Sequence, residues 1–521
     1  MRFIDFFDQG ASRNPDAPCF IHDETEQMFT FRHLREITLR TANALRADGF
    51  SIGMKGAVLS PNDAVGFACL LGIVRAGMVW VAINPRNALD ENCFILDNFE
   101  CEILFYHSAF EQAIEAIRKR VPRIRRFVCI DRPGNNAPAL LEWVREQPAD
   151  EIDPGTGTDD LVLLQTTGGT TGVPKGAMHT NRSLEGFFAN MYSVFQFEDT
   201  PPVYLAAAPI THAGGYLALF VLAQGGTVVL QSKIDPKLLC AAIERRRISF
   251  LYLPPTAIYG LIASPAVKEH DLSSLRYFAY GAAPMAPEKL RECLKLFGPV
   301  MLQAFGQTET LFPVTYLARA DHRGADGGNA DDKRLTSCGR AAPFARLGIM
   351  DDSGNLLGDG EHGEIVVRAT SVMAGYYKNP EETARANAFG WHHTGDIGYR
   401  DGDGFYYIVD RKKDMIVTGG FNVWSVEVEK VLQSHPAVMD CAVIGVPDDK
   451  WGEAVHAVVE LKSGQKVTGD ELIALCKEKI GSVKSPKGVE FIDALPRSAV
   501  GKVLKRHLRD RYWQGHARRV G

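Results

Sequence analysis

The sequence lacks the features that mark several specialised classes of protein. Its ten cysteines form no Cys-x-x-Cys pair, which argues against a zinc site or a disulfide framework and fits a reducing compartment. The net charge of −5 gives no reason to expect nucleic acid as a partner. Hydrophobic residues make up 45% of the chain and charged residues 23%, which excludes a disordered or fibrous protein.

Long uncharged runs are also scarce. The stretch from Thr200 to Ser232 contains no Asp, Glu, Lys or Arg, and an uncharged run of this length could cross a membrane. Pro209 and the residues after it interrupt this stretch, so we expect a buried strand, a loop, a buried helix and a second strand at Thr227–Leu230. Acidic residues occur too early at the N-terminus for a secretory signal. We therefore expect a cytoplasmic protein with no transmembrane segment.

The pattern along the chain changes twice. Because 521 residues are too many for one small core, we expect at least two domains. Apolar, strand-like runs alternate with helical stretches between about residues 54 and 310, which is typical of βα units around a parallel sheet. Residues 335–410 carry Gly-rich turns and alternating strands, which indicates antiparallel pairing. A further α+β module of about 110 residues begins near Arg411.

One loop has the composition of a polyphosphate cradle. Residues 166–176 read Thr-Thr-Gly-Gly-Thr-Thr-Gly-Val-Pro-Lys-Gly and follow a strand expected at Leu161–Gln165. Glycines let backbone N–H groups approach phosphate oxygens, threonines add hydroxyl donors, and Lys175 adds a mobile positive charge. The Gly-Lys-Ser/Thr ending of a Walker A loop is missing. The loop by itself is also compatible with a flexible surface segment.

Further motifs occur beyond this loop. They are Tyr280–Met285, Gln303–Glu309, Trp391–Asp396, Asp410–Asp414 and Pro496–Lys502. In their order and spacing they resemble the motifs of the acyl-adenylate-forming superfamily, in its acyl-CoA synthetase or 4-coumarate-CoA-ligase-like branch. The resemblance covers essentially the whole chain, with departures at Thr166, Gly168 and Ala304.

The resemblance implies a particular α/β fold. Its large N-terminal part, residues 1–410, would contain two doubly wound αβ subdomains and a distorted β-barrel. Residues 411–413 would form a hinge with Lys413 at the pivot. A small, mobile α+β domain would occupy residues 414–521.

The resemblance also implies an activity, which is ligation of a carboxylic acid to coenzyme A at the expense of ATP. A carboxylate is a poor acylating agent because its leaving group would be an oxide. Attack of the carboxylate on the α-phosphorus of ATP forms acyl-AMP, which CoA can then convert to a thioester. The first step needs a triphosphate cradle, a divalent cation and charge neutralisation at the α-phosphate. ATP, Mg²⁺ and CoA are the implied cofactors and co-substrates.

Four residues match catalytic positions of that family. The resemblance implies that Glu309 and Thr170 hold Mg²⁺ on the phosphates, and that Lys502 bridges the carboxylate and the α-phosphate. His212 matches a histidine at the mouth of the acyl pocket. Taken alone, each of these residues would more often be a capping, solvated or core residue.

Other residues match nucleotide and CoA contacts. Asp396 and Arg411 would hold the ribose, Phe305 would stack on adenine, and Gly419–Gly420 would line the pantetheine tunnel. The residues expected to bind ATP or CoA are Thr167, Gly168, Gly169, Thr170, Thr171, Lys175, Gly281, Ala282, Ala283, Pro284, Gln303, Ala304, Phe305, Gly306, Thr308, Asp396, Arg411, Lys413, Gly419, Gly420 and Lys502.

The sequence leaves alternatives open for the activity. A fatty acyl-AMP ligase or luciferase-like enzyme would adenylate without CoA transfer. Amino-acid adenylation proteins place an Asp near the position of His212, whereas Thr200–Ser232 has no acid. A catalytically dead nucleotide-binding regulator is disfavoured because the set of catalytic and nucleotide-binding residues is complete: Thr170, Glu309, Asp396, Arg411 and Lys502.

The acid is expected to be fatty or aromatic. Candidate pocket residues carry no Lys or Arg, which argues against a dicarboxylate; they are His212, Tyr216, Tyr280, Met285 and Phe312. Basic residues cluster at Arg118–Arg126 and after Lys502, and we interpret both clusters as solvated helix faces. Peripheral membrane contact and a homodimer remain open from the sequence.

Overall fold

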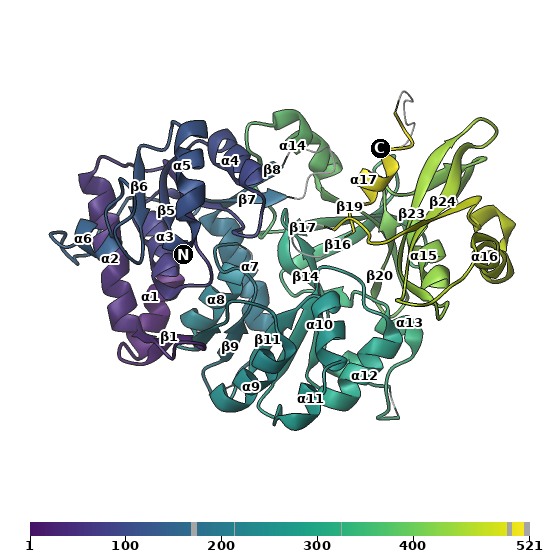
Figure 1. Ribbon diagram of the computed structural model, residues 1–521, viewed down its shortest axis with the longest axis horizontal. Helices are drawn as coiled ribbons and strands as arrows, with labels where there is room; N and C mark the ends of the chain where they lie inside the picture. The colour runs from purple at the N-terminus through teal and green to yellow at the C-terminus, as the bar shows by residue number, and fades with distance from the viewer. Residues whose placement is uncertain (168–173, 199, 213, 325, 498–502, 515–521) are drawn as a thin grey trace. The chain divides into compact units, whose positions relative to one another are not determined.

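The computed structural model describes the chain except for residues 168–173, 199, 213, 325, 498–502 and 515–521 (Figure 1). The chain forms two compact units. Unit 1 comprises Met1–Arg346 and Val367–Asn387, and unit 2 comprises Leu347–Val366 and Ala388–Gly521. The hinge expected at residues 411–413 stays a prediction.

Unit 1 contains two large sheets with parallel centres. The nine-stranded sheet has the order β15 (Arg340–Ala341), β14 (Leu311–Leu317), β13 (Met301–Gln307), β12 (Tyr277–Gly281), β11 (Phe250–Leu253), β9 (Val203–Ala206), β10 (Thr227–Leu230), β1 (Pro18–His22), β2 (Met28–Thr30). The seven-stranded sheet has the order β18 (Gly375–Tyr376), β8 (Lys175–Thr180), β7 (Leu161–Thr167), β4 (Val79–Ala82), β3 (Lys55–Leu59), β5 (Cys101–Tyr106), β6 (Arg126–Cys129).

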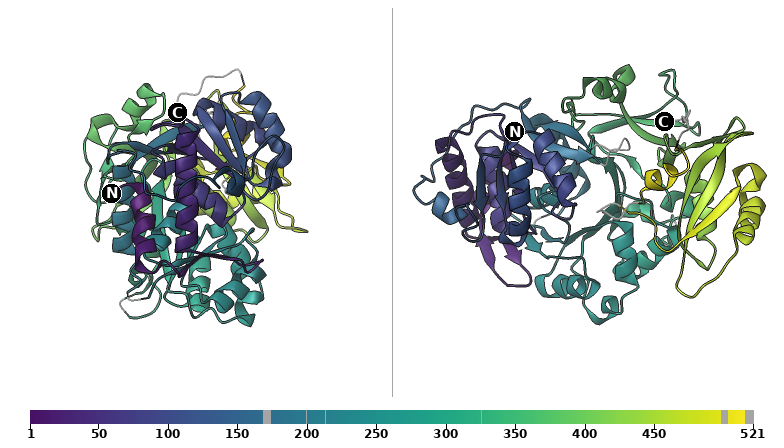
Figure 2. Two further views of the ribbon diagram at one scale, coloured as in Figure 1. Left: turned by 90° about the vertical axis from the view of Figure 1, so that its left-hand side faces the viewer. Right: turned by 45° about the horizontal axis from the view of Figure 1, so that its top comes forward.

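Helices cover both faces of these sheets, as the two views in Figure 2 show. The largest core cluster joins one face of each sheet to α1 (Phe3–Arg13), α2 (Phe31–Ala47), α3 (Ala64–Arg75), α7 (Asn181–Val194) and α8 (Gly214–Ala223). The opposite face of the nine-stranded sheet packs on α9 (Pro236–Arg246), α10 (Pro255–Ile262), α11 (Ala266–Glu269), α12 (Pro287–Phe297) and α13 (Asp332–Leu335). The opposite face of the seven-stranded sheet packs on α4 (Leu89–Asn98) and α5 (Glu111–Arg120). This arrangement confirms the doubly wound αβ layers. The short helix α6 (Leu140–Trp143) follows β6, and α14 (Pro380–Ala386) follows β18.

The uncharged stretch from Thr200 to Ser232 contributes two strands and a helix to the core, as expected. It contains β9, the buried helix α8 and β10, and α8 is buried along its whole length. Within the described residues, no helix is both long and apolar enough to cross a membrane. All ten cysteines are buried and none forms a disulfide.

Unit 2 is built mainly from two smaller sheets. The four-stranded sheet has the order β16 (Ala345–Met350), β17 (Gly363–Ala369), β19 (His392–Arg400), β20 (Tyr406–Arg411). The five-stranded sheet has the order β22 (Phe421–Val423), β21 (Ile416–Thr418), β24 (Gly452–Leu461), β23 (Val438–Asp448), with β25 (Gly488–Ile492) paired to β24. Helices α15 (Ser425–Gln433), α16 (Gly469–Lys484) and α17 (Lys505–Arg509) complete this α+β part, which confirms the separate C-terminal module.

Helix starts follow the chemistry of side-chain capping. Asp63 accepts a hydrogen bond from the Gly66 amide at the start of α3, and Asp235 caps α9 just before Pro236. Thr468 and Glu471 form a reciprocal capping box at α16. Each of these caps lies within a few residues of the helix start that it stabilises.

A buried arginine joins the first three helices. Arg75, at the end of α3, is 3% exposed and donates to both carboxylate oxygens of Asp8 on α1 at 2.6 and 3.0 Å. Its Nε donates to the Thr38 hydroxyl on α2 at 3.1 Å. Arg75 also contacts Glu151 at 3.3 Å.

Removing this guanidinium should destabilise unit 1. In Arg75→Ala, Asp8 would keep a half-buried charge without its main partner, which we expect to cost about 3 kcal/mol and to lower the thermal midpoint by several degrees. Arg32→Ala is the control, because Arg32 pairs with Asp16 on the exposed surface and its loss should change little. Equal midpoints for the two variants in differential scanning fluorimetry would contradict the structural role of Arg75.

Candidate active site

Two of the expected motifs leave the nine-stranded sheet at the same edge. Strands β12 and β13 are parallel neighbours, so residues 281–284 and 306–309 emerge side by side. Gly281 pairs with Ala304, and a Cβ on Gly281 would lie 2.3 Å from the Ala304 carbonyl oxygen. The close approach of the two strands therefore requires glycine at this position. Ala282 follows with a left-handed φ of 67°.

Contacts from distant segments hold the turn that carries Thr308 and Glu309. The turn joins the antiparallel strands β13 and β14. His179 Nε2 on β8 lies 2.8 Å from the Thr308 carbonyl oxygen, and the Met373 amide donates to the Glu309 carbonyl at 2.8 Å. Burial lowers the pKa of His179 to about 4, so the ring is neutral and its Nε2–H donates. The backbone at Glu309 is thus held from two sides.

The Glu309 side chain has a defined partner. The Tyr376 hydroxyl donates to Glu309 Oε1 at 2.8 Å. Burial and the Glu309 carboxylate both raise the pKa of Tyr376 above its usual value, so the hydroxyl keeps its proton. Strand β18 places Tyr376 beside β8, where it pairs with Ala177. Lys175 Nζ lies over the Tyr376 ring, 5.1 Å from the ring centroid.

Lys175 and Thr167 stand opposite each other at the base of the Gly-rich loop. They are paired residues of the antiparallel strands β7 and β8. Lys175 forms an ion pair with Glu382 on α14, and the two side chains are 16% and 26% exposed. The loop residues Gly168, Gly169, Thr170 and Thr171 lie outside the described residues, so their expected contacts stay predictions.

The donor set at Glu309 fits a magnesium ion bound through phosphates. In the described part of the chain, no three His, Cys, Asp or Glu side chains gather in a cluster that could hold a metal ion. Mg²⁺ in nucleotide sites is commonly held by one or two carboxylates, with phosphates and water supplying the other ligands. A single partly exposed carboxylate such as Glu309 meets that requirement.

His212 belongs to a hydrogen-bonded group at the end of β7. The Gln165 side-chain amide lies 2.7 Å from His212 Nε2, and the Tyr216 hydroxyl donates to the Gln165 oxygen. Burial lowers the pKa of His212 to about 4, so this group of three side chains is uncharged at neutral pH. Uncharged side chains of this kind would suit an apolar or aromatic acyl group.

The expected acyl-pocket residues do not all share one face of the sheet. Tyr216 and Phe312 pack in the cluster that faces α7 and α8. Tyr280 and Met285 belong to the cluster on the opposite face, and the Tyr280 hydroxyl lies 3.0 Å from His322 Nε2. Tyr216 therefore packs against one face of the nine-stranded sheet and Tyr280 lies on the other, and their places in the acyl pocket stay predictions. Alternation along β12 turns the Tyr280 side chain away from Tyr216.

The adenine motif alternates in the same way along β13. Ala304 belongs to the cluster facing α7 and α8, while Gln303 and Phe305 point to the other side of the sheet. Phe305 is 9% exposed. The Gln303 Oε1 atom is buried and accepts no hydrogen bond from any described residue. A Cβ on Gly306 would lie 2.1 Å from the Leu311 carbonyl oxygen, so Gly306 permits the tight turn.

In unit 2, the expected ribose residues are cross-strand neighbours. Asp396 on β19 pairs with Arg411 on β20, and Arg411 Nε lies 2.5 Å from Asp396 Oδ1. The Asp396 side chain is 3% exposed, whereas that of Arg411 is 41% exposed. Burial and the positive charge of Arg411 lower the pKa of Lys413 to about 8. The three residues that the resemblance assigned to ribose and hinge thus lie close together.

The two glycines expected at the pantetheine tunnel form a tight turn. Gly419 and Gly420 link β21 to β22 with φ of 56° and 83°, values that favour glycine. The Gly419 amide donates to the Trp451 carbonyl at 2.8 Å, and a Cβ on Gly419 would lie 2.5 Å from the Trp451 ring. The aromatic rings of Trp451 and Phe421 are 43% and 60% exposed.

Lys502 lies outside the described residues, and its assigned role stays a prediction. The described residues that follow it are anchored to α15. Lys505 Nζ contacts Glu429 at 2.7 Å and donates to the Ser425 hydroxyl at 2.6 Å. Ser425 in turn donates to Asp410 Oδ1 at 3.0 Å. This buried cluster connects the segment after Lys502 to the end of β20.

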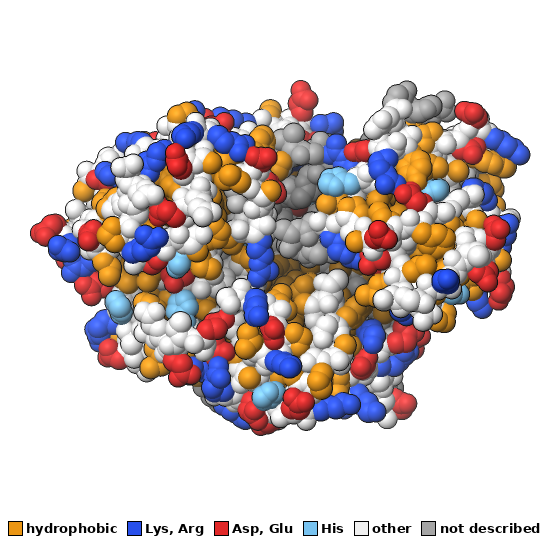
Figure 3. All heavy atoms as spheres, viewed as in Figure 1, with side chains coloured by type: hydrophobic (Ala, Val, Ile, Leu, Met, Phe, Trp, Pro, Cys, Tyr) orange, Lys and Arg blue, Asp and Glu red, His pale blue; other side chains and the backbone are white. Residues whose placement is uncertain are grey.

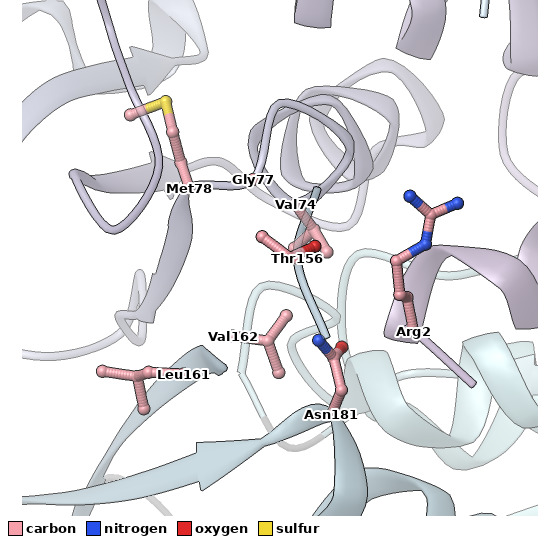
Figure 4. Close-up of a pocket in the computed structure, with 8 residues that line it drawn as sticks. All are labelled: Arg2, Val74, Gly77, Met78, Thr156, Leu161, Val162 and Asn181. Atoms are coloured by element: carbon pink, nitrogen blue, oxygen red, sulfur yellow. The ribbon is translucent and has the colours of Figure 1, made fainter. Parts of the chain in front are cut away.

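Two cavities lie away from these motifs. A cavity of about 10 Å³ borders Leu161 at the start of β7, and Figure 4 shows Arg2 and Asn181 beside it. A cavity of about 650 Å³ borders Tyr277 at the start of β12 and includes Arg319 and Arg323. Both are at the amino ends of strands, opposite the edge that carries the motifs. In Figure 3, acidic and basic side chains are interspersed over the visible face.

Sequence reasoning missed several residues of the site. Tyr376, Glu382, His179 and Gln165 contact expected site residues through segments far apart in the chain. The only sequence signal for Tyr376 is the aromatic pair before the Asn-Pro start of α14. Gln165 directly precedes the Gly-rich loop, which would have been a reason to include it.

Comparisons with known proteins agree with this geometry. A family model described as AMP-binding enzyme matches residues 7–377, and one described as AMP-binding enzyme C-terminal domain matches residues 427–502. A medium/long-chain-fatty-acid–CoA ligase of Mycobacterium tuberculosis is 36% identical over 92% of this chain and 85% of its own. The feruloyl-CoA synthase of an Amycolatopsis species is 35% identical over 96% of this chain and 97% of its own. The structure of ATP-bound MatB from Rhodopseudomonas palustris is 29% identical with a TM-score of 0.87, covering 99% of this chain and 100% of that one.

Removing the Tyr376 hydroxyl should weaken the binding of Mg²⁺·ATP. A hydrogen bond to a partly exposed carboxylate contributes at the low end of the range for charged groups, so Tyr376→Phe should raise the Kd about tenfold in calorimetry. Tyr377→Phe is the matched control, because the Tyr377 hydroxyl donates to Glu100 instead. An unchanged Kd in Tyr376→Phe would show that this hydroxyl does not orient Glu309.

Proposed function

The chain belongs to the AMP-binding enzyme family and is an ATP-dependent acid:CoA ligase, and we propose which of its residues serve each half-reaction. In the first half-reaction, a carboxylate oxygen attacks the α-phosphorus of ATP, giving acyl-AMP and pyrophosphate. In the second, the CoA thiol attacks the acyl carbon and AMP leaves. Relatives are named for fatty acids, feruloyl-CoA and indoleacetate, which supports a fatty or aromatic acid here.

The observation that carries the first assignment is that Lys175 and Glu309, which have opposite charges, both contact Tyr376. Lys175 offers a cation to the β- and γ-phosphates, and Glu309 offers a carboxylate for a divalent ion. When bound there, Mg²⁺ would neutralise phosphate charge that otherwise repels the incoming carboxylate. Tyr376 stands by both side chains and orients Glu309. Thr308 and the Gly-rich loop complete the set that surrounds the phosphates.

The second assignment concerns the nucleoside. Asp396 accepts hydrogen bonds from the vicinal ribose hydroxyls, since a buried carboxylate has two strong acceptor oxygens. Arg411 holds that carboxylate in place through its ion pair. Phe305 supplies the aromatic surface for adenine, and the buried Gln303 amide offers polar atoms on the same side of β13.

The third assignment concerns the thiol step. Gly419 and Gly420 present backbone without side chains next to the exposed ring of Trp451, which suits a narrow pantetheine chain. Lys502 serves adenylation, whereas this turn serves thioester formation. Both belong to the C-terminal part of the chain, so we assign the change between half-reactions to a rotation of residues 414–521 about Lys413.

We also place the protein in the cytoplasm, because ten buried, reduced cysteines match a reducing compartment. A monomer and a homodimer are distinguished by size-exclusion chromatography with light scattering.

The proposed chemistry is tested by following pyrophosphate and thioester separately. With a panel of acids, we expect acid-dependent pyrophosphate release without CoA, and acyl-CoA only when CoA is added. Pyrophosphate without any thioester would identify an adenylating enzyme that lacks CoA transfer. The absence of acid-dependent pyrophosphate would contradict the ligase function.

Removing the positive charge at residue 502 should affect one half-reaction only. Lys502→Ala should slow pyrophosphate release on the order of a hundredfold, because the charge that builds on the α-phosphate loses its partner. Thioester formation from supplied acyl-AMP should remain close to the unaltered rate. Equal loss of both half-reactions in a folded protein would refute the assignment.

A side chain at the glycine turn should have the opposite effect. In Gly419→Ala the new Cβ meets the Trp451 ring at 2.5 Å, so the backbone or the ring must move. We expect the pyrophosphate burst to persist and CoA transfer to fall at least tenfold. Gly464→Ala is the control, because Gly464 also has a left-handed φ of 75° but no neighbour within 4 Å of the added Cβ. Equal effects of the two variants would indicate backbone strain alone.

A further inference from the structure

Helix α17 begins three residues after Lys502 and packs on the five-stranded sheet of unit 2. Its Leu508 side chain is 2% exposed and lies in one core cluster with Ala442 of β23. Just beyond the helix, Trp513 Nε1 donates to the Gly445 carbonyl, also on β23, at 2.9 Å. The helix that follows Lys502 is therefore attached to the C-terminal module and would move with it.

One side chain of α17 reaches the end of β20 through a serine. Lys505 Nζ donates to the Ser425 hydroxyl at 2.6 Å, and this hydroxyl donates to Asp410 Oδ1 at 3.0 Å. The Ser425 amide donates to the other oxygen of the same carboxylate. Ser425 is 0% exposed and Asp410 is 2% exposed, so water has little access to these bonds. We call these three residues, Asp410, Ser425 and Lys505, the latch.

A second side chain of α17 reaches the other side of the proposed pivot. Arg509 Nη1 lies 3.0 Å from Asp414 Oδ1 and donates to the Lys413 carbonyl at 3.3 Å. The Arg509 side chain is 12% exposed. Because residues i and i+4 of a helix lie on the same face, Lys505 and Arg509 face the segment 410–414 together. Through the latch and through Arg509, α17 contacts the chain on both sides of Lys413.

A rotation about Lys413 would leave the Arg509 contact intact. Arg509 and Asp414 both lie within residues 414–521, which would move together. Their ion pair would therefore be present in every orientation of the C-terminal module. It does not distinguish one half-reaction from the other.

The latch, by contrast, has to open in such a rotation. Asp410 precedes the pivot and pairs with Ile397 in the four-stranded sheet, whereas Ser425 and Lys505 follow the pivot. Opening takes both Ser425 donors away from the buried Asp410 carboxylate, which disfavours the open state. The latch is thus a contact that one orientation of the module has and another lacks.

A closed latch favours the half-reaction that uses Lys502. Lys502 precedes Lys505 by three residues, so the attachment of Lys505 to β20 limits how far Lys502 can lie from the end of that strand. The residue after Asp410 is Arg411, whose Nε contacts Asp396, the carboxylate proposed to hold the ribose. A closed latch therefore keeps the segment that carries the adenylation lysine near the ribose residues.

We propose that Asp410, Ser425 and Lys505 hold the C-terminal module in place for adenylation and release it for CoA transfer. The three side chains are positioning residues, because they act on the placement of Lys502 and not on the substrates. The latch rests on the half-reactions and the rotation proposed above. It adds the contact that sets the balance between the two orientations.

The test removes the serine hydroxyl. Ser425→Ala breaks the link between Lys505 and Asp410 but leaves Lys505 paired with Glu429 at 2.7 Å, so the module should still fold. We expect kcat for acid-dependent pyrophosphate release to fall about tenfold, which corresponds to one hydrogen bond to a charged group. The KM for ATP should be nearly unchanged, because no residue proposed to bind ATP is altered. Thioester formation from supplied acyl-AMP should be at least as fast as in the unaltered protein.

A second measurement reports on the latch without any substrate. Trypsin cleaves after lysine and arginine, so it can cut at residues 411–413, next to the latch. Cleavage there, followed by mass spectrometry, should be faster in Ser425→Ala. It should also be faster in Asp410→Asn, which keeps the size of the side chain but weakens the acceptor. An unchanged or slower cleavage rate in both variants would overturn the latch, whatever the activity of the protein.

Two variants of α17 separate the latch from other effects. Arg506→Ala removes a surface ion pair with Asp510 on the same helix and should change neither half-reaction nor the cleavage at residues 411–413. Arg509→Ala removes the contact that moves with the module, so it should leave the ratio of the two half-reaction rates unchanged. An equal shift of that ratio in Arg509→Ala and Ser425→Ala, or an equal loss of both half-reactions in Ser425→Ala, would contradict the latch. No pyrophosphate release with any acid by the unaltered protein would instead overturn the ligase function.

Discussion

The parallel pairing of β12 with β13 is the constraint on which the site in unit 1 depends. It brings residues 281–284 beside residues 306–309, and it is possible only because Gly281 leaves room for the Ala304 carbonyl. The turn after β13 is then held from the other sheet by His179 and from residue 373. The backbone of Glu309, the carboxylate proposed to hold the metal ion, is therefore fixed from two sides.

The sequence predicts the features that depend on neighbouring residues, such as helix starts. It does not predict the contacts that depend on pairing between distant strands. The starts of α3, α9 and α16 could be predicted from the sequence because the capping residues lie within a few residues of them. The motif at Glu309 was recognisable by resemblance. Tyr376 was not, because its role depends on β18 pairing with β8, about two hundred residues earlier in the chain. The sequence also did not reveal that Tyr280 faces away from Tyr216, because a motif of loop residues does not show which face the last strand residue occupies.

Two lysines in unit 2 show how differently burial can act on one type of side chain. Lys505 is surrounded by acids, and Glu429 and Asp410 raise its pKa above the usual value despite burial. Lys413 is also buried, but the nearby Arg411 adds to the effect of burial and lowers its pKa to about 8. Lys505 is therefore a fixed structural charge. Lys413 can lose its proton just above neutral pH, because burial and the charge of Arg411 both disfavour its charged form.

In the role proposed for Lys175 as a phosphate ligand, its ion pair with Glu382 has a consequence for turnover. A phosphate oxygen that approaches Lys175 competes with a carboxylate that is already in contact with it. The lysine therefore gives less net binding energy to the triphosphate than an unopposed charge would give. The same competition acts on pyrophosphate after it forms, because Glu382 can recapture the lysine as the product moves away. An internal competitor thus trades affinity for a faster departure, which benefits an enzyme whose first product must leave before the second chemical step.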